Sequence, residues 1–205
     1  SGKTAVYIAE LPSGLIVKKT YSLEESKIPG QNFFINLAMV IQNTAQANLD
    51  LSEYSLYLGS AAPLYEKERP THTGFFWYEG NEMHFEDATA FKGGWFSSER
   101  SIITSESDNS IAYAGVTDQF FSTVVRPKKA EKTQVWGKPK QVRLTKNGQS
   151  LAAVRAAMVF PETTLAPDSP VVLEYKIYTG PKANTTLREL DNANGAGKGW
   201  GEIMQ

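Results

Sequence analysis

Short segments with the two-residue period of β-strands run along most of the chain, and this pattern limits the fold more than any other feature. Proline, glycine, asparagine and aspartate, which are common in turns, separate the segments. No helical pattern lies between them, so they predict an antiparallel β-sandwich rather than a parallel α/β sheet. The predicted strands are residues 14–23, 32–44, 54–60, 110–127, 141–146, 154–161 and 170–179.

The segment 32–44 shows the alternation most clearly, and we expect it to pair with 14–23 across the break at 28–30. One of its faces is apolar throughout, which predicts that this face belongs to the core. The residues of that face are Phe33, Ile35, Leu37, Met39 and Ile41. In segment 110–127, Phe120 shares a face with Val116 and Val124, so Phe120 is also predicted to be buried between the sheets.

The hydrophobic period changes near the C-terminus. Residues 171–179 have the composition of a strand, whereas Ala183, Leu187 and Leu190 recur at helical spacing. This pattern predicts a short C-terminal helix over 181–192. Pro181 suits the first helical position, because the N–H that proline lacks would have no partner there, and Gly195 offers a stop. Such a helix either directs the chain onward or only covers a sheet edge.

Length and composition fit a single domain, residues 1–205, that is large enough to bury its own core. The 21 Lys and Arg residues nearly balance the 22 Asp and Glu residues, so the overall charge gives no support for a nucleic-acid partner. No run of about 18 apolar residues predicts a membrane span. The absence of cysteine excludes disulfides, thiolate metal sites and cysteine nucleophiles.

Candidate catalytic chemistry is sparse. The two histidines are His72 and His84, and Glu86 and Asp87 follow the second closely. This group could form an acid/base pair or part of a metal site, but zinc needs three or four converging ligands, and surface carboxylates near a histidine are common. A loop or edge-strand cluster is therefore the favoured explanation of the group. Since no nucleophile elbow, dinucleotide fingerprint or phosphate loop occurs, we predict no catalytic residue, cofactor site or metal site.

Aromatic side chains offer two interpretations. The four tryptophans, Trp77, Trp95, Trp136 and Trp200, could stack on sugar rings. In the stretch GFFWYEG at 74–80, however, strand alternation would send Phe75 and Trp77 to one face and Phe76 and Tyr78 to the other. Core packing on both faces would then account for these aromatics without a ligand.

A basic run extends from Arg126 to Lys146 and holds eight cations against the single acid Glu131. One interpretation is a solvated loop and an exposed strand face. The other is contact with anionic lipid head groups, in which each nearby cation contributes about 1 kcal/mol. Lys128, Lys129 and Lys132 are the candidates for that contact.

Several motifs, in a consistent order, carry a resemblance to a known family. In 111–127 an aromatic pair follows Gln119 and leads to a proline, and in 171–190 a strand runs into Gly-Pro and then a leucine-bearing segment. The closing GKGWGEIMQ and the strand pair that ends in Asn43-Thr44 add to the pattern. From Leu15 to Gln205, the chain resembles the periplasmic domain of the YidC membrane-protein insertases, of the YidC/Oxa/Alb family. The glycine-pair hairpin with which that domain usually begins is not found here.

The resemblance implies a twisted antiparallel β-supersandwich like that of galactose mutarotases, on the periplasmic side of the bacterial inner membrane. It implies a non-enzymatic scaffold or docking surface that assists membrane-protein insertion and folding. The implied partners are the insertase membrane domain, Sec translocase components and nascent membrane proteins, and the basic run adds anionic lipid head groups as a further candidate. Residues 195–205 would begin the connection to the membrane domain, and Leu187, Leu190 and Trp200 are candidate contacts with a partner or the membrane surface.

A second class of function is a sugar-binding or aldose-epimerising member of the mutarotase-like sandwiches. That chemistry needs a general acid and a general base facing one sugar, usually a histidine with a carboxylate. The two histidines lie twelve positions apart, outside the motif context expected of such an enzyme.

Overall fold

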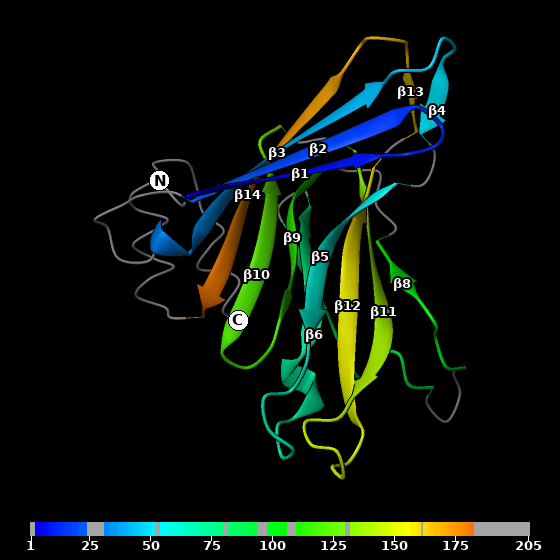
Figure 1. Ribbon diagram of the computed structural model, residues 1–205. Coiled ribbons are helices and arrows are strands. Elements are labelled where there is room, and N and C mark those ends of the chain that lie inside the picture. The colour runs from blue at the N-terminus through cyan, green and yellow to red at the C-terminus, as the bar shows by residue number, and fades with distance from the viewer. Residues whose placement is uncertain are drawn as a thin grey trace.

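The computed structural model describes residues 3–23, 31–51, 54–79, 82–93, 98–105, 110–129, 132–160 and 162–182, which form an almost entirely β structure (Figure 1). The larger sheet contains eight antiparallel strands. In spatial order they are β1 (Thr4–Glu10), β2 (Leu15–Leu23), β3 (Phe34–Asn43), β14 (Val171–Pro181), β10 (Phe121–Pro127), β9 (Ile111–Thr117), β6 (Gly74–Glu79) and β7 (Glu82–Asp87). This arrangement confirms the predicted antiparallel sandwich.

A second sheet of four strands covers part of one face of the larger sheet. Its spatial order is β5 (Ser55–Ala61), β12 (Leu151–Val159), β11 (Gln134–Val142) and β8 (Ile103–Thr104). A two-stranded sheet pairs β4 (Leu49–Leu51) with β13 (Thr163–Leu165), and two short 3-10 turns are η1 (Gln31–Phe33) and η2 (Pro70–His72). Figure 1 shows that the larger sheet is strongly twisted, because β1, β2 and β3 cross the top at a steep angle to β9 and β10.

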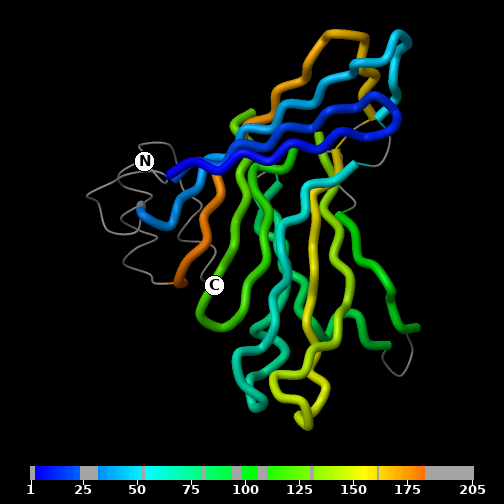
Figure 2. Tube along the Cα trace, in the orientation of Figure 1, coloured from blue at the N-terminus to red at the C-terminus, as the bar shows by residue number. Residues whose placement is uncertain are grey.

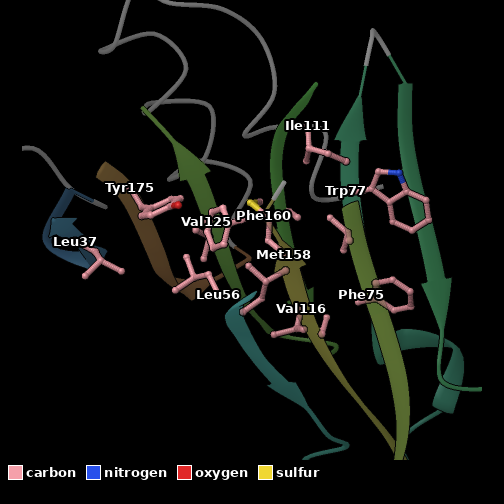
Figure 3. Packing of buried hydrophobic residues seen from close by; sticks show 14 of the residues in the cluster. Leu37, Leu56, Phe75, Trp77, Ile111, Val116, Val125, Met158, Phe160 and Tyr175 are labelled. Carbon is pink, nitrogen blue, oxygen red and sulfur yellow. The ribbon is translucent and has the colours of Figure 1, made fainter. Parts of the chain in front are cut away.

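The main core lies between the two larger sheets. Phe75 and Val116 from the eight-stranded sheet meet Leu56 and Met158 from the four-stranded sheet, and all four are buried (Figure 3). A smaller cluster occupies the outer face of the larger sheet and contains Phe34, Phe76, Tyr113, Val124 and Tyr178. The alternation predicted for 74–80 is confirmed, since Phe75 and Trp77 join the main core while Phe76 belongs to the outer cluster.

The prediction that 14–23 pairs with 32–44 is confirmed, because β2 pairs with β3 along nine residue positions from Leu15↔Asn43 to Leu23↔Ile35. Leu37, Met39 and Ile41 lie in the main core as predicted. The prediction for Phe33 is wrong. Phe33 belongs to η1 and is 38% exposed, whereas its neighbour Phe34, the first residue of β3, is fully buried in the outer cluster.

The prediction that 110–127 forms one strand is also wrong, since a turn at 118–120 divides it into β9 and β10. Asp118 makes that turn with its side chain, because its Oδ1 accepts hydrogen bonds from the N–H groups of Phe120 and Phe121, both at 2.8 Å. Phe120 therefore lies in the turn and is 48% exposed. Val116 and Val124, which were predicted to share its face, are buried on opposite faces of the sheet, in the main core and in the outer cluster. The strand register that predicted the burial of Phe120 does not extend through the turn.

Two further predicted boundaries need correction. The strand expected at 141–146 instead ends at Val142, as the last part of β11, and 143–150 form a loop. Pro181 does not begin a helix. It is the last residue of β14 and pairs with Phe121, the first residue of β10. The strand therefore continues through the position where the helix was expected to begin. The rest of the predicted C-terminal helix lies outside the described residues.

Candidate docking surfaces

The histidine cluster predicted around His84 has a different geometry from the one its sequence neighbours suggest. His84 lies on β7, an edge strand, directly opposite Trp77 on β6. Its ring stacks on the Trp77 indole with centroids 5.0 Å apart and an interplanar angle of 10°. Its Nε2 lies 3.4 Å from Oε1 of Glu79, which is the diagonal neighbour across the hairpin.

The carboxylates expected beside His84 do not pair with it in the described contacts. Oδ1 of Asp87 accepts hydrogen bonds from the N–H and hydroxyl of Thr89 instead. His72 lies on η2 with an exposed side chain. Within the part of the chain that the structure describes, no group of three or more His, Cys, Asp or Glu residues could hold a metal ion.

Sequence reasoning missed Glu79 as the partner of His84. Glu79 is 8% exposed, and its Oε2, like the indole Nε1 of Trp77, is buried with no hydrogen-bond partner among the described residues. The signal that could have found it is the hairpin register, which places Glu79 two pairs along the ladder from His84, on the same face of the sheet. The arrangement is a stacked aromatic pair with one polar neighbour at a sheet edge.

A groove with a mixed polar and apolar lining, which we call the polar groove after its charged side chains, crosses the outer surface of the larger sheet. Its volume is about 640 Å³, and it runs over β2, β3, β14 and β10. The charged residues along it are Arg126, Lys128, Glu174 and Lys176, and Nζ of Lys128 binds the Glu174 carboxylate at 2.9 Å. The polar side chains of Thr20, Ser22 and Asn36 line the same space. The groove offers hydrogen-bond donors and acceptors along several strands.

The basic run is divided between the two ends of the sandwich. Lys128 follows β10 and bonds through its N–H to the carbonyl of Glu174, and Lys132 forms a bridge with Ser110 before β11 begins. Arg143 and Lys146 lie past the opposite end of β11. Between the two ends, Nζ of Lys138 lies 4.8 Å above the Trp136 ring. The eight cations therefore do not form one continuous surface.

The remaining predicted contacts, Leu187, Leu190 and Trp200, lie outside the described residues, as does Trp95. The role of Lys128, Lys129 and Lys132 in lipid contact stays a prediction. Over the described ranges, no helix is both long enough and apolar enough to cross a membrane.

The geometry of the described residues defines an all-β domain: a twisted sandwich with a polar groove and a histidine that stacks on an indole. The family comparison agrees with this class, because residues 3–199 match the model of the YidC periplasmic domain. The chain therefore belongs to the YidC periplasmic domain family, and the family places it on the periplasmic side of the inner membrane. No curated protein matched the sequence.

Proposed function

We propose that this domain is a non-catalytic docking scaffold of a membrane-protein insertase, and that the polar groove receives an extended polypeptide segment. The groove carries the proposal, since it spans four strands and combines cations, a carboxylate, hydroxyls and an amide. Such a lining can satisfy the backbone N–H and C=O groups of a bound chain without selecting one sequence. The partners proposed from the family are Sec translocase components and nascent membrane proteins.

Position-specific crosslinking tests this proposal in the full-length insertase within its membrane. A photoreactive residue at Asn36, inside the groove, is expected to crosslink to a translocase subunit or a nascent membrane protein. The matched control is Gln134, an exposed strand residue of the smaller sheet. Equal labelling at the two positions would show that the groove is not the docking surface.

Carbohydrate handling is the second candidate function, and the His84–Glu79 pair beside the Trp77 indole is the observation that favours it. The geometry fits catalysis poorly, because the His84 ring stacks on the Trp77 indole and its partner Glu79 is buried, whereas an acid/base pair must reach a bound sugar. Polarimetry with several aldoses is expected to match the uncatalysed rate. Activity that disappears in His84→Ala would favour the enzyme instead.

A further inference from the structure

Three connections at the lower end of the sandwich expose large apolar side chains together. They are the segment from β5 to η2, the turn between β9 and β10, and the loop from β11 to β12, which lie at the same end of the molecule in Figure 2. Five residues there are between 42% and 50% exposed: Leu64, Tyr65, Phe120, Phe121 and Leu144. We call this group, with the cations of the same loops, the loop-end surface.

Hydrogen bonds join these connections to one another and fix their relative positions. The phenolic hydroxyl of Tyr65 donates to Oε1 of Gln119 at 2.7 Å. The buried carboxylate of Glu68 accepts from the N–H of Leu64 at 2.7 Å and from the N–H of Gln119 at 3.3 Å. The amide of Gln149 reaches the carbonyl of Glu66 at 2.8 Å and ties the third loop to the first.

The exposed charges of these loops are mainly positive. Lys67, Arg69, Arg143 and Lys146 are exposed, against Glu66 as the exposed acid of the same segments. The other two carboxylates of these connections are less accessible to a partner, because Glu68 is buried and Asp118 is partly buried with its Oδ1 accepting the hydrogen bonds of the turn. The loop-end surface therefore combines protruding apolar side chains with surrounding cations.

From this combination we infer that the loop-end surface contacts an anionic lipid bilayer. Aromatic and leucine side chains gain by entering the boundary between head groups and acyl chains, while lysine and arginine meet the lipid phosphates. β14 ends at Pro181 beside Phe121, so the last described strand also points to this end of the molecule. The inference rests on the membrane setting of the proposed function, but it assigns the contact to different residues from Lys128, Lys129 and Lys132.

Vesicle flotation of the 205-residue chain tests the electrostatic part. The chain is expected to float with vesicles of phosphatidylglycerol and phosphatidylethanolamine at low salt, and not with phosphatidylcholine vesicles. Lys67→Glu, Arg143→Glu and Lys146→Glu together should weaken binding by about tenfold or more. The matched control, Lys128→Glu, Lys129→Glu and Lys132→Glu, has the same net charge and should weaken binding much less. A larger loss in the control set would overturn the inference.

The apolar part has an independent test that does not depend on lost binding. Because the chain contains no cysteine, Phe120→Cys provides a single site for an environment-sensitive fluorophore. We expect blue-shifted emission from a label at position 120 with anionic vesicles. Val172 is 59% exposed on β14 near Lys128, and the emission of a label attached through Val172→Cys should not shift. A chain that binds vesicles without a shift at position 120, or that ignores anionic vesicles, would rule out the loop-end surface as the lipid contact. Because this assay uses no protein partner, its failure leaves the groove proposal standing.

Discussion

The ring of Phe75 packs directly on the backbone of Gly137, across the interface between the two sheets. Phe75 lies on β6 of the larger sheet and is fully buried, while Gly137 lies in the middle of β11 of the smaller sheet. A Cβ added at position 137 would overlap the Phe75 ring. Glycine is therefore required here by the close approach of an aromatic ring.

Gly137→Ala is expected to destabilise the domain by about 1–3 kcal/mol, because the extra carbon would force the Phe75 ring or β11 to move. Urea unfolding followed by fluorescence measures this loss. Lys140→Ala, at an exposed position of the same strand, is the control and should change stability little. Equal stability of the two variants would contradict the close packing.

Phe120→Ala should cost less than about 1 kcal/mol, because the ring is half exposed in the β9–β10 turn and leaves no closed cavity. Phe76→Ala is the buried counterpart on β6, at 1% exposure, and should cost about 3–5 kcal/mol. Urea unfolding of both variants gives the comparison. If Phe120→Ala were as costly as Phe76→Ala, the turn residue would have to be buried.

Glu68→Ala should loosen the loop-end surface and cost about 1–3 kcal/mol, because it removes the acceptor from two N–H groups, those of Leu64 and Gln119. Hydrogen exchange at the Gln119 amide should become faster. Glu66→Ala is the control, because it removes a nearby exposed carboxylate but keeps the main-chain carbonyl that Gln149 binds. Unchanged exchange in Glu68→Ala would show that the carboxylate does not hold the two loops.

Stability should fall in alkaline solution through Tyr178. Burial raises the pKa of Tyr178 to about 12 from its ordinary value of 10.0. The folded state thus holds the phenolic proton more tightly than the unfolded state, so this contribution is complete below about pH 10 and is lost as the pH rises toward about 12. Urea unfolding between neutral and alkaline pH should show a steeper loss for the native chain than for Tyr178→Phe. Parallel pH profiles would contradict the assignment.

Tyr178→Phe should also cost stability at neutral pH, because the Tyr178 hydroxyl donates a hydrogen bond to the carbonyl of Pro181 at 2.7 Å. Loss of one such bond is expected to cost about 1 kcal/mol. Tyr7→Phe is a suitable comparison for the same chemical change at an exposed position, since Tyr7 is 64% exposed, and it should change stability little.

The alternation of apolar and polar side chains along the strands is sufficient to predict much of the fold. The residues Leu37, Met39 and Ile41 could be assigned to the core because a strand has only two faces, and a polar face can be told from an apolar one. The aromatic stretch at 74–79 was interpretable for the same reason. Successive aromatic residues in a strand point to opposite faces, so the sequence predicts that both faces of this strand are packed, and both face a hydrophobic cluster.

Interactions between distant segments decided the rest. Phe33 and Phe120 were both predicted to be buried, but both are exposed, because Phe33 lies in η1 before β3 and Phe120 lies in the turn at Asp118. Periodicity alone does not show where a strand begins or ends. Glu79 became the partner of His84 through the hairpin register. Glu68 joined two loops 51 residues apart through one carboxylate. The two-residue period is a local property of the chain and can be read from the sequence, whereas loop contacts and partners depend on strand pairing, which only the tertiary structure fixes.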